Sequence, residues 1–571
     1  MKKLTAIFIL VLILAIFLRV YKLNDFPPGL YSDETSFGYN AYSLLKTGRD
    51  EFGTSWPLSF KSFGDYKPPM TVWLTLSSIA ILGLTEFAVR LPSAVAGITS
   101  VIIVYFLTRE IFSIDNRIPN LNKKYLLYLP VISALLLTIS PWHLHFSRSS
   151  MLVGIELMFI SAGLLFFLKA LKKQIFLPVS AICFSGAIYT YYGSRITIPL
   201  LVVGLLLIFK NELWKLKKTL LLSALLGLIL IMPLFLAILK EPEVLTGRAK
   251  TVSVFYDSGI ESKLWEAHTL DGPDFPVLVS RFFHNKPYFY FKDISRRYLQ
   301  HFSADFLFFT GDSHPPFDIP NMGNIYIIDA PFILLGLFLV IKYNQKKTLS
   351  LLLLLLIAPI ASSLTFVTPA ANRSFLMVVS ITILTALGII FITKTLSDKL
   401  KNSWKITASF IAILYTISFS YYLYNYIQVT PIEIPEKWHY GRKELVEKVS
   451  SKEDNFGKVV ISNKGGPSYI WFLFYKQYYP QLYWQTAQVN DRPDEFGFIH
   501  VDSFDKYRFI KKIDWSNLEK EKDALYVGFQ DEIPLDWIGQ IDGVFYKMVN
   551  DDQVNYPNGD TAFKLAHLEP I

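Results

Sequence analysis

The chain has 571 residues, of which 52% are hydrophobic, 16% aromatic and 18% charged, and its formal net charge is +9. Apolar runs such as 220–239 and 375–392 approach the roughly 20 residues that cross a bilayer as a helix, which excludes an ordinary soluble protein. The positive charge forms no basic stripe suited to nucleic acid, and the single cysteine, Cys183, excludes an internal disulfide.

The apolar runs predict a polytopic α-helical membrane protein with about eleven transmembrane helices. The first run follows Met1, Lys2 and Lys3, and no small-residue cleavage site comes after it. We therefore expect it to be a retained helix and not a removed signal peptide. The expected spans are 4–20, 87–108, 125–140, 150–168, 175–192, 196–209, 219–239, 325–341, 349–366, 375–393 and 406–426.

Lysine and arginine gather in alternate loops between these spans, as in 215–218 and 342–347. Positively charged loops stay in the cytoplasm, so the other loops are predicted to lie on the outer face. The pattern indicates a multi-pass protein of the plasma (inner) membrane. Its two long outer loops are 21–86 and 240–324.

The segment 68–84 is also apolar, but treating it as a span would place every later lysine cluster outside. We therefore expect a helix that lies at the outer interface or dips into it. A second interfacial helix is expected over 33–45, because Phe37, Ala41 and Leu44 share one helical face.

Hydrophobic density falls in the tail of the chain, where patterns typical of water-exposed proteins begin. Strands are predicted at 458–461, 524–529 and 544–546, and a helix at 469–478. The expected organisation is therefore a transmembrane domain over 1–427, which includes both outer loops, and a small extracytoplasmic α/β domain over 428–571.

Two charged motifs stand out in the first outer loop. Asp33-Glu34 opens it, and Asp65-Tyr66-Lys67-Pro68-Pro69 comes near its end. Together with Arg90-Leu91-Pro92, they resemble the membrane glycosyltransferases of the GT-C class. The closest likenesses are the protein O-mannosyltransferases and the aminoarabinose and other polyprenyl-phosphate sugar transferases. In those families an Asp-Glu pair opens the first outer loop, and an acid-x-His/Lys-Pro motif closes it. Lys67 departs from the mannosyltransferase pattern, which has histidine there, and agrees with the aminoarabinose branch.

The acids fit the chemistry of sugar transfer to a hydroxyl. A carboxylate beside the acceptor can remove the hydroxyl proton as it attacks, and Asp33 is the candidate general base. Its alternative is a helix cap, because Ser32 and Asp33 lie at the start of the predicted helix, where a cap belongs. Glu34 either binds sugar hydroxyls or is a first-turn acid favoured by the helix dipole. Asp65 could orient Lys67, a metal or the acceptor.

Cations at outer helix ends could stabilise the charge on a leaving phosphate. Lys67, fixed by the prolines after it, is the first candidate, with membrane-interface snorkelling as its alternative. Arg148, Arg195 and Arg373 are further candidates for phosphate contact, and each could instead be an interface anchor.

Four more outer residues are candidates for a substrate pocket. His143 and His145 stand two residues apart and do not share a helix face, so no metal site is assigned to them. Asp312 and His314 belong to an Asp-Ser-His-Pro-Pro sequence that echoes the motif at Asp65. No cofactor is expected with certainty, and a divalent metal stays open.

The resemblance implies an inverting glycosyltransferase that moves a hexosyl or pentosyl group from a polyprenyl-phosphate donor to an acceptor hydroxyl. The acceptor, a protein, lipid or glycan, is left open, and the tail is a candidate for positioning it. The alternatives are an oligosaccharide ligase or polymerase that uses lipid-linked glycans, and a lipid or solute transporter. The near absence of charged residues inside the spans argues against transport.

Overall fold

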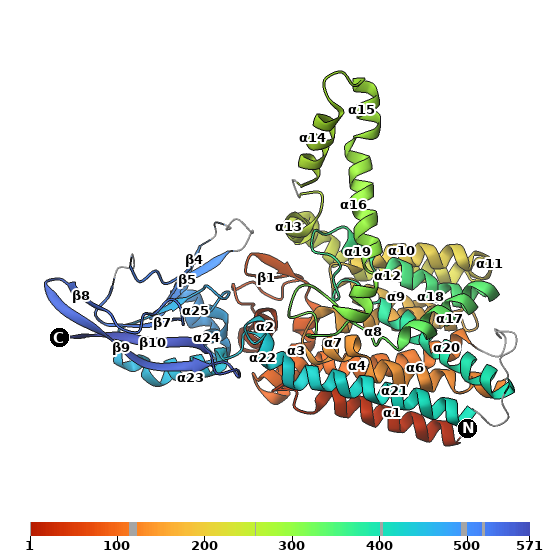
Figure 1. Ribbon diagram of the computed structural model, residues 1–571, viewed down its shortest axis with the longest axis horizontal. Helices are drawn as coiled ribbons and strands as arrows, with labels where there is room; N and C mark the ends of the chain where they lie inside the picture. Colours follow the sequence, from red (N-terminus) through yellow and green to blue (C-terminus); the bar gives the residue numbers. More distant parts are fainter. Residues whose placement is uncertain are drawn as a thin grey trace. The chain divides into compact units, whose positions relative to one another are not determined.

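The computed structural model describes residues 2–112, 123–256, 259–399, 404–490, 492, 499–516 and 520–571. Their contacts divide the chain into two compact units. Unit 1 comprises 1–19, 95–147 and 152–423, and unit 2 comprises 20–94, 148–151 and 424–571. Figure 1 shows the elements of both units.

Unit 1 is built almost entirely from helices. Its described elements, some of which continue into unit 2, are α1 (Lys2–Val20), α4 (Glu86–Ile111), α5 (Lys123–Leu126), α6 (Leu129–Ile139), α7 (Pro141–Arg148), α8 (Leu152–Ala170), α9 (Phe176–Ile188), α10 (Ser194–Ile208), α11 (Lys210–Trp214), α12 (Lys217–Lys240), α13 (Glu243–Val252), α14 (Gly259–Asp271), α15 (Val277–Phe283), α16 (Lys286–Gln300), the π-helix η1 (Asp305–Phe309), α17 (Asp329–Tyr343), α18 (Lys346–Ile357), α19 (Ile360–Ser363), α20 (Met377–Lys399) and α21 (Trp404–Tyr424).

Seven helical segments in the described part of the chain are long and apolar enough to cross a membrane. They are Lys2–Val20, Glu86–Ile111, Leu152–Ala170, Lys217–Lys240, Lys346–Ser363, Met377–Asp398 and Trp404–Glu433. The pair α6 and α7, bent by 58° at its break, would make an eighth. The polytopic helical fold is thus confirmed, and the chain is an integral multi-pass membrane protein.

The count of eleven spans is not confirmed. At two of the expected positions stand the shorter helices α9, with 13 residues, and α10, with 15 residues. Another expected span corresponds to α17, also with 15 residues. These lengths fall short of the roughly 20 residues that a perpendicular span requires. Hydrophobic runs therefore located the helices but did not fix their lengths.

Helices α17 and α20 pack closely because a glycine of each helix faces the backbone of the other helix. A side chain at Gly336 would collide with the backbone of Leu384, and one at Gly388 with the backbone of Phe332. Such close approach of backbones is a common way to pack transmembrane helices, which have little hydrophobic drive to associate in lipid.

Unit 2 combines the segment after α1 with the tail of the chain. Its described elements are α2 (Ser32–Thr47), β1 (Phe60–Ser62), β2 (Asp65–Lys67), α3 (Met70–Leu82), η2 (Asn425–Val429), α22 (Thr430–Glu433), η3 (Glu436–Trp438), α23 (Arg442–Lys452), η4 (Glu453–Asn455), β3 (Lys458–Ser462), α24 (Tyr469–Tyr475), α25 (Pro480–Thr486), β4 (Gln488–Asn490), β5 (His500–Phe504), β6 (Tyr507–Ile510), β7 (Ala524–Phe529), β8 (Ile538–Ile541), β9 (Val544–Asn555) and β10 (Thr561–Pro570).

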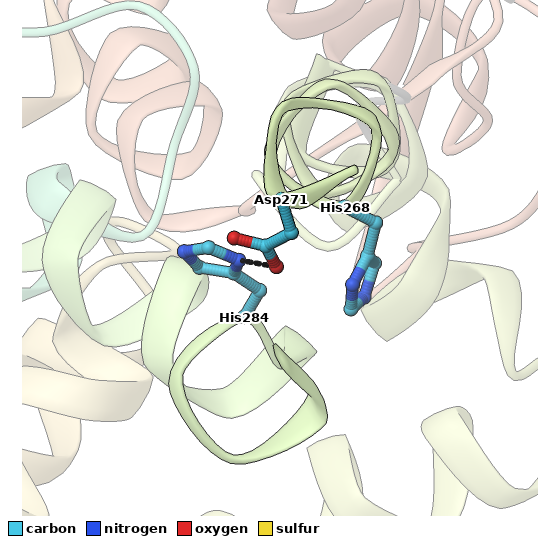
Figure 2. Close-up of side chains that lie close together, drawn as sticks. All are labelled: His268, Asp271 and His284. Carbon is cyan, nitrogen blue, oxygen red and sulfur yellow. Dashed lines mark hydrogen bonds and ion pairs between the residues drawn. The ribbon is translucent and has the colours of Figure 1, made fainter. Parts of the chain in front are cut away.

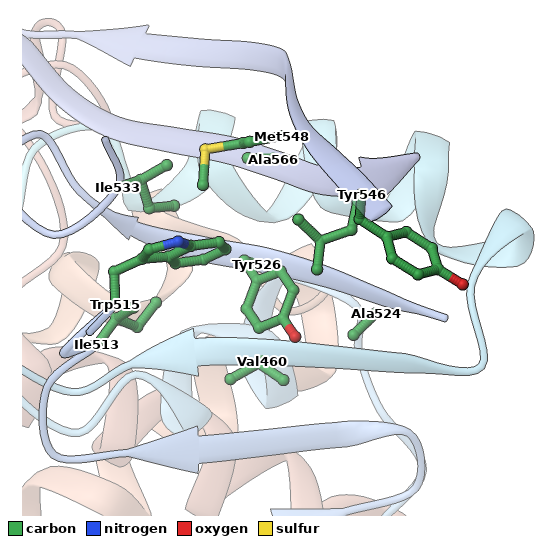
Figure 3. Close-up of a cluster of buried hydrophobic side chains, with 10 residues drawn as sticks. Val460, Ile513, Trp515, Ala524, Tyr526, Ile533, Tyr546, Met548 and Ala566 are labelled. Atoms are coloured by element: carbon green, nitrogen blue, oxygen red, sulfur yellow. The ribbon is translucent and has the colours of Figure 1, made fainter. Parts of the chain in front are cut away.

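Eight strands of the tail form one mixed sheet in the order β4-β5-β6-β3-β7-β10-β9-β8. The central strand β3 runs parallel to β6 and β7, and the other pairs are antiparallel. Figure 3 shows part of its apolar core, in which the rings of Trp515 and Tyr526 lie 5.0 Å apart near Met548. The strands expected at 458–461, 524–529 and 544–546 correspond to β3, β7 and the start of β9.

Helix α2 packs against α24 of the tail, so the segment after α1 and the tail belong to one unit. Gly38 allows this contact, because a side chain there would collide with the ring of Phe474. The indole of Trp471 donates a hydrogen bond to the carbonyl of Leu30, with 3.0 Å between the two atoms. The segment that follows the first span is therefore held by the tail, over a sequence distance of more than 400 residues.

Candidate active site

The motif around Lys67 forms one strand of a small β-hairpin in unit 2. Strands β1 and β2 are antiparallel, with Ser62 opposite Asp65. Phe63 and Gly64, with φ of 55° and 85°, make the turn between them. Since side chains alternate along a strand, Asp65 and Lys67 project to the same face.

Lys67 links the two motifs of the first outer loop through its ammonium group. Its Nζ lies 3.1 Å from Oδ2 of Asp65 and 3.2 Å from Oδ1 of Asp33. The side chains of Lys67 and Asp65 are 10% and 8% exposed, whereas that of Asp33 is 31% exposed. The carboxylate of Asp33 is thus the accessible member of the cluster, and that of Asp65 is the buried one.

Asp33 lies in the first turn of α2, and the cap position belongs to another residue. The helix begins at Ser32, with Tyr31 as its N-cap. The interpretation of Ser32 and Asp33 as the helix cap is therefore wrong. Glu34 completes a capping box instead, since it accepts a hydrogen bond of 3.1 Å from the backbone N–H of Tyr31. The side chain of Asp33 points to Lys67.

Glu34 is fully buried and surrounded by protein donors. The guanidinium of Arg90 binds both of its carboxylate oxygens, each at 3.2 Å. The backbone N–H of Ser150 donates to Oε1 at 2.6 Å. Of the two roles that the sequence leaves open for Glu34, this arrangement favours the structural one.

Two buried arginines fix the segment that leads into α2. Besides binding Glu34, Arg90 donates to the backbone carbonyls of Leu23, Asn24, Pro27 and Gly29. Arg148 donates through Nη2 to the carbonyls of Tyr21, Lys22 and Phe26 and lies over the ring of Tyr426. The guanidinium of Arg148, a predicted phosphate ligand, is thus engaged with backbone.

Glu51 is a buried acid of unit 2 that was not predicted as a site residue from the sequence. Its buried carboxyl accepts a hydrogen bond from Tyr469, 2.6 Å away, and from the amide of Asn40. Burial raises the pKa of Glu51 to about 8. Only contacts between distant parts of the chain distinguish it from other loop acids, so no local signal could have found it.

The other two predicted phosphate ligands lie in unit 1. Arg195 donates through Nη1 to the carbonyl of Val244 and lies over the ring of Tyr192. Its Nε and Nη2 are buried and have no hydrogen-bond partner among the described residues. Arg373 donates to Thr365 and to the carbonyl of Val367.

The four candidates for a substrate pocket also lie in unit 1. His143 lies 2.7 Å from the guanidinium of Arg19, and Nε2 of His145 lies 2.8 Å from the carbonyl of Pro316. His145 lines a cavity of about 10 Å³, which has room for about one water molecule and not for a sugar.

Asp312 accepts hydrogen bonds from the backbone N–H groups of Ala371 and His314. Burial raises its pKa above the usual value. The His314 side chain is about half exposed, and its Nδ1 lies 3.6 Å from Asp312. The role of these residues in substrate binding stays a prediction.

Comparisons with known proteins agree with the class that the motifs resemble. The model of the dolichyl-phosphate-mannose-protein mannosyltransferase family matches residues 66–236. A search of curated proteins found no match.

Solved structures give a likeness over the whole chain. ArnT from Cupriavidus metallidurans in the apo state is 12% identical, with a TM-score of 0.53, over 99% of this chain and 98% of that chain. Its complex with undecaprenyl phosphate is also 12% identical, with a TM-score of 0.51, over 99% and 97%. The predicted GT-C fold is thereby confirmed.

A further match is the archaeal oligosaccharyltransferase AglB from Archaeoglobus fulgidus, in complex with an inhibitory peptide and a dolichol-phosphate. It is 15% identical, with a TM-score of 0.47, over 83% of this chain. This chain spans 63% of the length of AglB, less than two thirds.

Proposed function

We propose that this protein transfers a sugar from a polyprenyl-phosphate donor to an acceptor hydroxyl at the outer face of the membrane. The observation that carries the proposal is the ion pair between Asp33 and Lys67, which unites the two motifs of the first outer loop beside a buried Asp65. The fold shared with ArnT, whose structure holds undecaprenyl phosphate, supports a lipid phosphate as the leaving group.

Asp33 acts as the general base in this proposal. The acceptor oxygen attacks the anomeric carbon and forms the new glycosidic bond, while its proton passes to the carboxylate of Asp33. The bond from the anomeric carbon to the phosphate oxygen breaks with its electron pair, and polyprenyl phosphate leaves. Displacement in one step inverts the anomeric carbon. The partial exposure of Asp33 supports this role, because a base must reach its substrate.

Lys67 stabilises the leaving phosphate. A lipid phosphate gains charge as the sugar departs, and an ammonium at hydrogen-bond distance offsets that charge in a site of low dielectric. The incoming phosphate competes with Asp33 for Lys67, so donor binding would loosen the ion pair and release the carboxylate for the acceptor. Asp65, on the same face of β2, orients the ammonium.

Glu34, Arg90 and Arg148 serve as positioning residues. Their contacts hold the segment before α2 and the first turn that carries Asp33. The position of the base matters for the rate of transfer as well as its presence, because a small displacement of a catalytic group can lower the rate by a large factor.

Arg195 of unit 1 remains a proposed ligand for an anionic group of the substrate. Two buried guanidinium nitrogens that lack partners among the described residues are costly unless a ligand or water satisfies them. A phosphate or sugar oxygen is a suitable acceptor.

The proposal is tested with purified protein and radiolabelled polyprenyl-phosphate sugars, by comparing the wild type with Asp33→Asn. We expect the rate of sugar transfer to fall by about 100-fold or more. Asp25→Asn is the matched control, since Asp25 is an exposed acid of the same loop. Equal transfer rates in the wild type and Asp33→Asn would overturn the assignment.

The outer location of unit 2 has its own test. In a Cys183→Ser background, an impermeant thiol reagent should label Asp25→Cys and Gly543→Cys from outside intact cells. It should not label Lys215→Cys, which lies in a predicted cytoplasmic loop. The reverse labelling pattern would place the proposed site in the cytoplasm.

A further inference from the structure

A helical hairpin of unit 1 brings two histidines and an aspartate together. Helix α14 runs beside α16, and the short helix α15 joins them (Figure 1). His268 and Asp271 stand three residues apart in the last turn of α14, and therefore on one face of the helix. His284 follows the last residue of α15 and returns to the same place.

One ligand atom from each of these side chains lies within 4.8 Å of the others. In the described part of the chain, this is the one group of three or more His, Cys, Asp or Glu that meets this condition. Oδ2 of Asp271 lies 2.8 Å from Nδ1 of His284. Figure 2 shows the carboxylate of Asp271 between the two imidazoles.

The group is already oriented by a neighbouring hydroxyl. Oγ of Ser280 lies 2.6 Å from Nδ1 of His268, which leaves the other ring nitrogen to face a ligand. Such hydrogen bonds to the ligands are typical of metal sites built on histidine.

We propose that the hairpin binds a divalent transition-metal ion of the Zn²⁺ type through His268, Asp271 and His284. Two imidazoles and one carboxylate suit Zn²⁺, which is bound by nitrogen and oxygen ligands in a tetrahedron, whereas Ca²⁺ and Mg²⁺ prefer oxygen ligands alone. Three protein ligands leave the fourth position for water or for an exogenous group. The bound ion would fasten the end of α14 to the end of α15.

This inference does not depend on the proposed sugar transfer, because none of the three residues belongs to the Asp33 and Lys67 cluster. The sequence alone does not reveal this group, since a loop and a helix separate the two histidines. The pair of His268 and Asp271 on α14 is a common pattern on exposed helices, so by itself it does not predict a metal site.

The test uses the full-length protein, purified in detergent without a polyhistidine tag and treated with a chelator. Titration with Co²⁺, an optical probe for tetrahedral sites, should give visible absorption bands that saturate at one ion per chain and vanish when Zn²⁺ is added. His268→Ala and His284→Ala should abolish this binding. Ser280→Ala should weaken it by about 10-fold or more.

Lys286→Ala is the matched control in the same hairpin. It removes the ion pair of 2.6 Å with Glu261 but no proposed ligand, so binding should persist. Zn²⁺ should also slow hydrogen exchange in residues 259–300 of the wild type and not of His284→Ala. Absence of saturable binding, or binding that survives both histidine substitutions, would overturn the proposal.

Discussion

At the scale of single residues, Lys67 lies between two carboxylates that differ in accessibility. The side chain of Asp33 is 31% exposed and that of Asp65 only 8%. The sequence predicted that both belong to one site, but it left the role of Asp65 open. In the proposed reaction their roles differ, because a base must reach the acceptor, whereas a buried acid would act through the lysine it contacts.

Asp65→Asn tests this division of roles. The substitution keeps the shape of the side chain but removes the charge that orients Lys67, so we expect the KM for the donor to rise. Turnover should fall by about 10-fold, less than in Asp33→Asn. Steady-state kinetics over a range of donor concentrations separates the two effects. An unchanged KM for the donor would show that Asp65 does not act through Lys67.

Glu34 and Arg90 form the buried pair that fixes the start of α2, and their substitution should act on stability. Removing one partner leaves the other buried and uncompensated, so Glu34→Gln or Arg90→Met should each lower the free energy of unfolding by about 3–5 kcal/mol. Thermal unfolding in detergent checks this expectation.

The double variant Glu34→Gln/Arg90→Met provides the control for this pair. Because the two residues contact each other, its loss should be smaller than the sum of the single losses. Single variants that unfold like the wild type would contradict the positioning role.

At the scale of elements, hydrophobic runs located the helices but not their ends or bends. The span predicted over 125–140 stops where α6 ends. Helix α7 then begins at Pro141 and is bent by 58° from α6. The apolar segment 68–84 is α3, whose 13 residues extend about 20 Å, too short to cross a bilayer. Helix ends depend on turn residues and on tertiary contacts, which hydropathy does not report.

The turn between β1 and β2 gives a prediction at this scale. Gly64 has φ of 85°, and Gly64→Ala should destabilise the hairpin by about 1 kcal/mol and displace Asp65 and Lys67. We expect sugar transfer to fall at least several-fold. Transfer assays, together with the unfolding temperature, measure both effects.

Gly543 supplies a matched control for this substitution. It has φ of 82° in the turn between β8 and β9, with open space for a side chain. Gly543→Ala should therefore lose similar stability and keep full activity. Equal loss of activity in both variants would mean that the effect of Gly64→Ala is only general destabilisation.

At the scale of the whole molecule, contacts join parts of the chain that the sequence had assigned to different domains. The predicted division fell at residue 427, whereas unit 2 contains both 20–94 and 424–571. The bond between Trp471 and Leu30 illustrates the reason, since no local pattern reveals a partner so far along the chain. The strands β3 and β7 were predictable from their buried apolar residues, whereas β8 has a weak pattern.

The raised pKa of Glu51 predicts that the stability of unit 2 depends on pH. Its pKa is raised from 4.5 to about 8, so the folded protein binds more protons than the unfolded chain between these values. The free energy of unfolding should therefore fall as the pH rises through this range, by up to about 1.4 kcal/mol per pH unit from this group.

Glu51→Gln should remove the contribution of Glu51 to this slope. Because burial also raises the pKa of Asp50, to about 6, the comparison is made between about pH 6.5 and pH 8. Glu447→Gln, at an exposed acid of α23, should keep the slope of the wild type. An unchanged slope in Glu51→Gln would show that Glu51 is ionised in the folded protein.

A structure of the protein with undecaprenyl phosphate bound would test the central assignment most directly. We predict a phosphate oxygen at hydrogen-bond distance from Nζ of Lys67, with the carboxylate of Asp33 facing open space where an acceptor hydroxyl can enter. The assignment would be contradicted by a lipid phosphate bound elsewhere while the ion pair between Asp33 and Lys67 stays intact and covered by other parts of the protein.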